Sequence, residues 1–249
     1  MINLLNKISI INENSNATDD ICIKILDSKG VILISFINAH AYNLSYSNLA
    51  FKHTLENSDY LFRDGLGMEL LLNTLGMESG QNINGTDFIP ILLDRSAGHF
   101  SLALWGTNSP YNLNAKDRLT NEGLNVISVK DGFQDLNFYI RELKALSVKH
   151  ENIIVVLGMG MPKQEELAEL IKSYSSFEDT NIIIICGGAI LDFLGGKIKR
   201  APLIIRKLKS EWIYRLFIEP KRLFRRYVIG NFLFIFRMIV LRINLSRFK

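Results

Sequence analysis

Two kinds of hydrophobic pattern alternate along this chain of 249 residues. Short apolar runs rich in β-branched residues predict strands, and stretches with apolar residues every three or four positions predict amphipathic helices. Strands are predicted at residues 21–26, 31–37, 59–62, 101–105, 125–129, 152–157 and 181–186, and helices at 39–55, 86–97, 116–121, 135–149 and 162–174. Such alternation predicts an α/β fold with a Rossmann-like, mainly parallel sheet and helices on both faces.

The two ends of the chain depart from this rhythm. Residues 1–19 are rich in Asn, Ser and Asp, and we expect a loosely held arm there. Residues 197–249 contain 15 Lys or Arg and only two acids, a net charge of +13 within a chain total of +4, which leaves about −9 on residues 1–196. We therefore interpret the chain as a core, residues 1–195, followed by a basic, aromatic helical appendage, residues 196–249.

The appendage mixes cations with large apolar residues, as in the run Arg222 to Tyr227. This mixture favours an anionic membrane surface as partner. Nucleic acid is disfavoured, because RNA-binding sheets expose basic and aromatic residues whereas these strands are continuously apolar. The most apolar stretch, residues 228–241, is about 14 residues long and contains Asn231 and Arg237. A span needs roughly 20 residues, so we expect the appendage to lie on the bilayer.

The two cysteines and the N-terminus favour a cytoplasmic location. Cys22 and Cys186 both fall in apolar runs that read as strands, far apart in sequence. Two buried thiols without a disulfide framework are typical of a reducing compartment. The first residues also lack the basic, apolar and small-residue succession of a signal peptide. We therefore expect a protein that is peripheral on the inner face of the membrane.

The first chemically informative loop is Asp64-Gly65-Leu66-Gly67, between a predicted strand and a helix. Ligands of parallel α/β sheets bind beyond the carboxyl ends of the strands, where this loop falls. A carboxylate there can act as a general base, and the glycines let a ligand approach the backbone. The alternative is a turn aspartate that caps the following helix.

Two further glycine loops follow predicted strands. Gly158-Met159-Gly160-Met161-Pro162-Lys163-Gln164 suits a phosphate or ribose at a helix N-terminus. It is not a dinucleotide fingerprint, because Lys163 stands where the third glycine belongs, so no nicotinamide cofactor is expected. Gly187 and Gly188, with Asp192 nearby, form either one wall of a nucleotide pocket or a purely structural turn.

The histidines show no ligand spacing, and two isolated cysteines complete no set, so no metal site is predicted. The appendage instead offers arginines. Arg222, Arg225 and Arg226 can share one helical face, with Arg206 and Arg215 nearby in sequence. Guanidinium groups are suited to phosphate oxygens because they make forked, charge-assisted hydrogen bonds. A solvated charge run is the alternative, although such runs seldom contain so many aromatic residues.

Taken together, residues 34–227 resemble the WecG/TagA/CpsF family of bacterial glycosyltransferases, glycosyltransferase family 26. The resemblance rests on Asn-Ala-His-Ala at 38–41, Asp-Gly-x-Gly at 64–67, Asn-Gly-Thr-Asp at 84–87 and Gly-x-Pro-Lys-Gln-Glu at 160–165. It continues through Gly-Gly at 187–188, Arg-Ala-Pro at 200–202, Glu-Trp at 211–212 and Arg-Leu-x-x-Glu-Pro-x-Arg-Leu-x-Arg-Arg-Tyr at 215–227. The order and spacing of the whole set make the resemblance specific.

The resemblance implies an inverting, metal-independent transfer of a hexose or N-acetylhexosamine from a UDP-sugar to a polyprenyl diphosphate-linked sugar, in synthesis of a cell-surface polysaccharide. Asp64 is then the general base, and Arg215, Arg222 and Arg225 bind the diphosphate. No cofactor is implied, because the UDP-sugar is a substrate. The donor pocket comprises Asn38, Gly65, Gly67, Asn84, Asp87, Gly158, Gly160, Lys163, Gln164, Gly187, Gly188 and Asp192.

Two positions depart from family members that use N-acetylmannosamine. Those members often have Thr and Arg where this chain has Phe36 and Asn82, which favours a different hexose. The competing functional class is a non-catalytic protein that binds anionic membranes or nucleic acid through its basic tail. The sequence identifies neither sugar nor linkage, and a homo-oligomer is possible.

Overall fold

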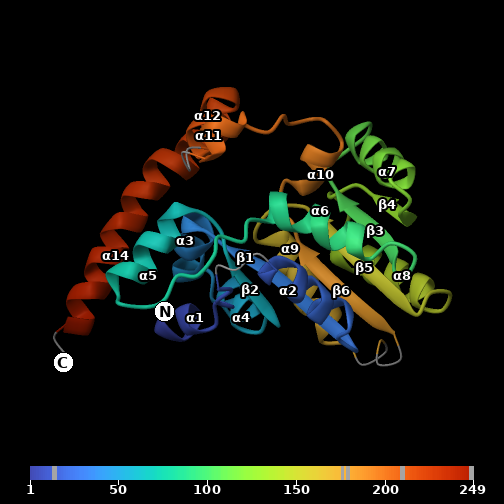
Figure 1. The fold of residues 1–249 in the computed structure, drawn as a ribbon, viewed down its shortest axis with the longest axis horizontal. Helices are drawn as coiled ribbons and strands as arrows, with labels where there is room; N and C mark the ends of the chain where they lie inside the picture. The colour runs from blue at the N-terminus through green and yellow to red at the C-terminus, as the bar shows by residue number, and fades with distance from the viewer. Residues whose placement is uncertain (13–15, 175–176, 178–179, 208–210, 247–249) are drawn as a thin grey trace.

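The computed structural model describes residues 1–12, 16–174, 177, 180–207 and 211–246, without the side chains of Lys207 and Arg222. One parallel sheet has the strand order β2-β1-β6-β5-β3-β4 (Figure 1). Its strands are β1 (Val31–Ile37), β2 (Tyr60–Arg63), β3 (Ser101–Gly106), β4 (Asn125–Lys130), β5 (Asn152–Gly158) and β6 (Asn181–Cys186). The predicted α/β fold is confirmed.

Helices cover both faces of the sheet because alternate strand residues point to opposite sides. In β6, Ile183 and Ile185 face one hydrophobic cluster, whereas Ile182 and Ile184 face another. The first cluster also contains α2 (Ala17–Leu26), α6 (Gly85–Arg95), α7 (Tyr111–Asn121) and α10 (Ile190–Leu194), and the second contains α8 (Leu136–Ser147) and α9 (Lys163–Lys172). The continuous apolar strands are thus explained by burial on both sides.

One predicted strand is wrong, since residues 21–26 belong to helix α2. Ile21, Cys22 and Ile25 are buried at helical spacing, and Asp19 in the first turn pairs with Arg95 of α6. The β-branched composition of the run suggested a strand, but packing of one helical face against α6 determined the structure. Cys22 is therefore on a helix, whereas Cys186 is on a strand as expected.

The N-terminal residues are also better ordered than expected. Leu4 and Leu5 of α1 (Ile2–Asn6) are buried, and Ile8 bridges to Leu61 of β2. The predicted arm is therefore wrong for residues 2–8, which pack beside the edge strand, and for residues 17–19, which begin α2. Residues 13–15 lie outside the described residues. The predicted helix at 39–55 is two helices, α3 (Ala39–Ser47) and α4 (Leu49–Glu56), because Asn48 caps α4 through Phe51 N.

The appendage begins after α10, and its described part consists of helices and the segments joining them. These helices are α11 (Leu203–Lys207), α12 (Glu211–Ile218), α13 (Pro220–Phe224), the π-helical turn η2 (Arg225–Ile229) and α14 (Gly230–Ser246). In Figure 1 they run from α10 past α11 and α12, and α14, in red, then descends beside α3 and α5 (Leu66–Thr74). The appendage thus lies against the core at the end of the sheet where the site loops gather.

Helix α14 is attached to the core along one face. Phe234 is 4% exposed and belongs to the cluster that contains α1, α3, α4 and α5. Asn43 Nδ2 donates to Gly230 O at 2.7 Å, and Arg237 donates to Asn43 O at 2.7 Å. Arg237 also lies over the ring of Tyr46, 4.3 Å from its centroid. This face of α14 is therefore specified by both polar and apolar contacts.

The helical run that ends in α14 is longer than the sequence pattern suggested. Residues Arg225–Ser246 form 22 continuous helical residues that are long and apolar enough to cross a membrane, by length and composition alone. The expected limit of about 14 residues is wrong because neither Asn231 nor Arg237 ends the helix. Only 6% of the apolar window is buried, which leaves a large apolar surface exposed.

Candidate functional site

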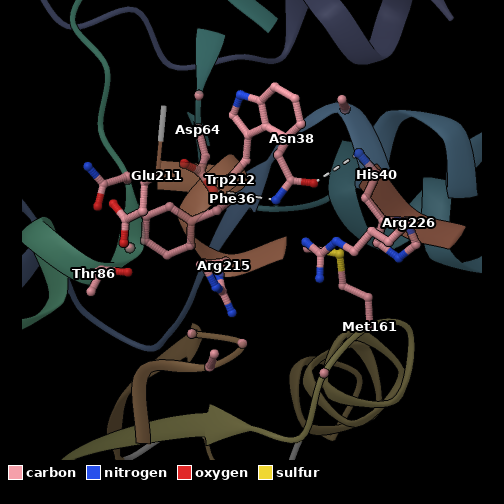
Figure 2. Close-up of a pocket in the computed structure, with 18 of the residues that line it drawn as sticks. Phe36, Asn38, His40, Asp64, Thr86, Met161, Glu211, Trp212, Arg215 and Arg226 are labelled. Atoms are coloured by element: carbon pink, nitrogen blue, oxygen red, sulfur yellow. Dashed lines mark hydrogen bonds between the residues drawn. The ribbon is translucent and has the colours of Figure 1, made fainter. Parts of the chain in front are cut away.

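A cavity of about 810 Å³ opens at the carboxyl ends of β1, β2, β3, β5 and β6. Its walls come from the loops after these strands and from α12, η2 and α14 of the appendage. Figure 2 shows Asn38, His40 and Asp64 of the core together with Glu211, Trp212, Arg215 and Arg226 of the appendage around this cavity. Residues far apart in sequence therefore enclose one space, as expected for a parallel sheet.

The loop that presents Asp64 is fixed from several directions. Asp64 N donates to Ile37 O at 2.9 Å, which continues the pairing of β2 with β1. Arg63 is buried and donates to Ser79 O and Gly80 O, both at 2.8 Å. Gly65 has φ +89°, a conformation favoured by glycine, and its N–H donates to Asn82 Oδ1 at 2.7 Å. Asp64 is thus held at the cavity floor by main-chain geometry.

The pKa of Asp64 is raised because the surrounding chain screens the carboxyl group from bulk solvent. Part of the residue still faces the cavity. The hydrogen bond from Asn38 Nδ2, at 3.4 Å from Asp64 Oδ2, opposes this shift, as do the charges of Arg226, Arg215 and Arg63. A carboxylate under these opposing influences is suited to accept and return a proton.

Asn38 has two roles in this arrangement. Its side-chain oxygen accepts from His40 N at 3.1 Å and Ala41 N at 3.0 Å, which caps α3. The cap occupies the oxygen, so the amide nitrogen is turned toward Asp64 (Figure 2). Predicted as a donor-pocket residue, Asn38 lines the cavity and also orients the carboxylate.

The guanidinium groups of Arg215 and Arg226 point into the cavity from the appendage (Figure 2). Arg215 lies over the ring of Phe193, 5.5 Å from its centroid, and its buried Nε has no hydrogen-bond partner among the described residues. Arg225, one of the three predicted diphosphate ligands, is exposed and does not line the cavity, whereas its neighbour Arg226 does. The side chain of Arg222 lies outside the part of the chain that the structure describes.

His40 forms the wall beside Arg226. Burial lowers the pKa of its imidazole to about 4, and the charge of Arg226 lowers it further in the same direction. At neutral pH the ring is therefore uncharged, with one nitrogen able to donate and the other able to accept. The neutral imidazole of His40 can therefore hydrogen-bond to a ligand in the cavity without adding a positive charge beside Arg226.

Most predicted donor-pocket residues line the cavity, namely Asn38, Gly65, Gly67, Asn84, Asp87, Gly158, Gly160, Gln164, Gly187, Gly188 and Asp192. Lys163 is not among the lining residues. Its ammonium group donates to Gly132 O at 3.0 Å and Gln134 O at 2.6 Å, which ties the start of α9 to the loop after β4. This lysine therefore stabilises the loop and does not face the cavity.

Asn84 and Asp87 face the cavity but are engaged with protein partners. Asn84 caps α6 by accepting from Asp87 N at 2.9 Å, and its amide donates to Asp87 Oδ2. Arg200 pairs with Asp87 at 2.5 Å, and Arg206 lies 3.7 Å away. Burial raises the pKa of Asp87, but the bonds from Arg200 and Asn84 and the charges of Arg200 and Arg206 bring it below its usual value. Asp87 thus joins the core to the appendage.

Asp192 belongs to a polar cluster at the end of β3. Thr107 Oγ1 donates to Asp192 Oδ1 at 2.5 Å, and Lys197 Nζ lies 3.1 Å from the same oxygen. Thr107 has φ +46°, an uncommon conformation for a residue with a Cβ. All three side chains line the cavity. The cluster presents a carboxylate whose charge is matched by a neighbouring ammonium group.

Several lining residues were not predicted as site residues. Thr107, Glu211 and Trp212 contribute polar or aromatic surface, and Phe234, Ile235 and Met238 of α14 form an apolar wall. Glu211 and Trp212 were already conspicuous as an acid and a tryptophan in a basic segment. The wall formed by α14 had no local signal, because its pattern only indicated apolar surface.

Within the described residues, no group of three or more His, Cys, Asp or Glu side chains is placed to hold a metal ion. A metal-independent transfer remains a prediction.

Comparison with known proteins agrees with the geometry of the site. Over 207 residues, the chain is 28% identical to the N-acetylglucosaminyldiphosphoundecaprenol N-acetyl-beta-D-mannosaminyltransferase of Staphylococcus aureus strain NCTC 8325. This match covers 82% of the chain and 78% of the relative. The corresponding protein of S. aureus strain MW2 is 27% identical over the same shares. Residues 4–248 match the Glycosyl transferase WecG/TagA/CpsF family, nearly the whole chain, so the protein belongs to this family of glycosyltransferases.

Proposed function

We propose that the protein transfers a hexose or N-acetylhexosamine from a UDP-sugar to a sugar carried on a polyprenyl diphosphate, with inversion at the anomeric carbon. The product contributes to a cell-surface polysaccharide. Support comes from the names of the S. aureus relatives, which describe a lipid diphosphate acceptor and transfer of an N-acetyl-beta-D-mannosaminyl group. It also comes from one juxtaposition, since Asp64 and the guanidinium groups of Arg215 and Arg226 open into the same cavity.

In the proposed reaction Asp64 accepts the proton of the acceptor hydroxyl while the hydroxyl oxygen attacks the anomeric carbon. The bond between that carbon and the β-phosphate oxygen breaks, and UDP leaves with the bonding electrons. Burial favours the protonated form of Asp64, whereas the hydrogen bond from Asn38 and the charges of the arginines favour the carboxylate. The group can therefore cycle between the two forms during turnover.

Arg215 and Arg226 stabilise the diphosphate as it leaves. Negative charge grows on the phosphate oxygens in the transition state, and preorganised cations there lower the barrier. Arg215 lines the cavity, where its guanidinium group can make such a bond. Since both arginines are in the appendage and line the cavity, the appendage completes the site.

The donor is proposed to be a hexose other than N-acetylmannosamine. Phe36 packs against Phe62 and Phe88, with ring centroids 5.9 and 6.4 Å apart, and also lines the cavity. Asn82, the second departure, bonds to Gly65 N. An aromatic ring and a short amide provide different hydrogen bonding from the Thr and Arg common among family members that use N-acetylmannosamine.

Membrane attachment is proposed to occur through the outer face of α14, with the protein peripheral on the cytoplasmic side. Phe232 is 72% exposed and Phe236 is 64% exposed, on the side of α14 away from the core contacts of Phe234 and Arg237. Crossing the membrane would separate Arg237 from Asn43 and place a cation in hydrocarbon. Lying in the interface preserves those contacts and buries the aromatic residues.

Alkaline carbonate extraction of membranes distinguishes these two modes of attachment. A peripheral protein is released into the supernatant, whereas a protein anchored by a spanning helix stays in the pellet. Phe232→Ser with Phe236→Ser should weaken binding to vesicles that contain anionic lipid. Retention of the wild-type protein in the carbonate pellet would contradict the proposed peripheral attachment.

The transferase proposal is tested by a donor screen with purified protein and a short-chain lipid diphosphate acceptor carrying one sugar. UDP release and the glycosylated lipid are measured across UDP-hexoses and UDP-N-acetylhexosamines. Acceptor-dependent product with one donor class supports the proposal. Binding to anionic vesicles without affinity for UDP would instead support the non-catalytic alternative.

A further inference from the structure

Gln164 and Glu165, adjacent residues at the start of α9, form a buried hydrogen-bonded pair beneath the cavity. Gln164 is 0% exposed and Glu165 is 1% exposed, although polar residues at this end of a helix commonly face solvent or ligand. Gln164 lines the cavity wall, whereas Glu165 lies behind it. The pair therefore occupies the layer that supports the predicted donor pocket.

The amide of Gln164 bonds to protein on both sides. Its nitrogen donates to Glu165 Oε1 at 2.8 Å, and its oxygen accepts from Gly188 N at 3.1 Å. Because Glu165 accepts a hydrogen bond from the amide nitrogen of Gln164, the oxygen of the same amide is directed at the loop between β6 and α10. Glu165 thus sets the orientation of the Gln164 amide, which in turn contacts the Gly187–Gly188 loop.

The loop that receives this bond has a specific main-chain conformation. Gly188 has φ +58°, in the left-handed region that favours glycine. A Cβ on Gly187 would lie 2.5 Å from Ile190 Cγ2, so the loop also approaches the following helix closely. Both glycines line the cavity. The bond from Gly188 N to Gln164 is therefore one of the contacts that fix the shape of the wall.

Glu165 is costly to bury, which argues against a role in stability alone. Its Oε2 is buried without a hydrogen-bond partner among the described residues. Burial raises the pKa of this carboxyl to about 8; the bond from Gln164 opposes the shift and the charge of Glu166 reinforces it. Cys186, whose thiol pKa is also raised by burial, faces it from β6. An apolar side chain of similar size would avoid these costs.

We propose that Glu165 is a positioning residue that holds Gln164 and, through it, the Gly187–Gly188 loop in the shape that binds the nucleotide part of the donor. This inference rests on the proposed use of a UDP-sugar. The predicted role of Gln164 changes accordingly: its amide braces the pocket, and its contact with the donor is made through the loop that it supports.

Glu165→Met is the direct test, because it keeps the volume and removes the acceptor. Hydrogen exchange at the Gly188 amide should lose protection, and the Kd for UDP should rise roughly tenfold, as expected when a buried amide loses its partner. The KM for the donor should rise by a similar factor, while kcat at saturating donor and the KM for the acceptor stay near wild type. Glu165→Gln retains a carbonyl oxygen and should restore protection, Kd and KM.

Ser58→Ala supplies the matched control, since Ser58 is also 0% exposed and donates to Ser35 Oγ and Thr54 O. It should lower the Tm without changing UDP affinity or Gly188 exchange. If Glu165→Met does not fold, Gln164→Met should give the same loss of Gly188 protection.

Wild-type protection at Gly188 and wild-type UDP affinity in Glu165→Met would overturn the inference. Absence of UDP binding by the wild-type protein would instead overturn the proposed function. The exchange measurement needs no substrate, so it separates the two outcomes.

Discussion

Asn38 Nδ2 lies 3.4 Å from Asp64 Oδ2, and the oxygen of the same amide caps α3. The cap therefore sets the direction of a hydrogen bond to the proposed base. Asn38→Ser should keep the cap, because serine is also favoured there, while removing the donor to Asp64. Since that bond lowers the pKa of Asp64, its loss raises the pKa, and the acidic limb of the kcat/KM profile should move toward higher pH. If the acidic limb of the kcat/KM profile does not move, Asn38 does not influence the pKa of the base.

Asp64→Asn tests the base itself. A general base contributes about 10²–10⁴-fold to rate, so kcat should fall by that order while the Kd for UDP changes little. The two quantities are measured by single-turnover transfer with labelled donor and by calorimetric titration of UDP. Full turnover by this variant would show that Asp64 is not the general base.

Adjacent arginines in η2 provide a matched pair. Arg226→Met should weaken UDP binding about tenfold or more, the scale of a lost hydrogen bond to a charged group. Arg225→Met, one residue earlier and exposed, should change the Kd less than about twofold, since an exposed charge is screened by solvent. Titration calorimetry at low and high salt measures both. If both variants lose UDP affinity equally, the sequence-based prediction that Arg225 binds the diphosphate is favoured.

The pairing of Asp87 with Arg200 and Arg206 predicts a measurable effect on the appendage. Asp87→Asn removes the carboxylate that these arginines share, so trypsin should cleave between residues 197 and 207 up to about fivefold faster, as expected for the loss of a half-exposed ion pair. Asp94→Asn, exposed on the same helix, is the control. Identical cleavage patterns for both variants would show that Asp87 does not hold the segment.

Glu165 predicts a pH-dependent stability. Its pKa is about 8 in the folded protein and near 4.5 in an unfolded chain, so folding takes up a proton between these values. The free energy of unfolding then falls as pH rises through this window, by up to about 1 kcal/mol per pH unit. Above pH 8 the destabilisation from the ionised, buried carboxylate is fully present. Glu165→Gln lacks this titration and should gain stability relative to wild type between pH 5 and pH 8. Urea unfolding at several pH values measures the difference, and parallel curves for the two proteins would contradict it.

The sequence predicted the sheet well because its strands are buried on both faces. Runs such as residues 152–157 and 181–186 are continuously apolar and short, and parallel pairing brings their carboxyl ends together. The loops at 64–67, 158–164 and 187–188 therefore meet at one cavity. The error at residues 21–26 shows the limit, since β-branched residues also form helices when one helical face packs well.

Side-chain roles were less predictable than loop positions. Lys163, Asp87 and Gln164 are polar residues in the first turns of helices that follow site loops. Each bonds to a protein group brought near only by the folded chain. Arg225 and Arg226 are neighbours that point to different sides of the helical turn η2, and the sequence does not state which side faces the core. Such choices depend on tertiary packing that no local pattern contains.

Helix α14 has an inner row, with Phe234 and Met238 at the cavity, and an outer row, with Phe232 and Phe236 exposed. The rotation of α14 about its own axis decides both which residues face the cavity and which face outward. Inserting one residue before Phe234 would turn the rest of the helix by about 100°, so that neither Phe234 and Met238 nor Phe236 would keep its present side. The amino acids on either row can be substituted independently, but the length of the segment that joins the core to this helix cannot vary by one residue without altering both surfaces together.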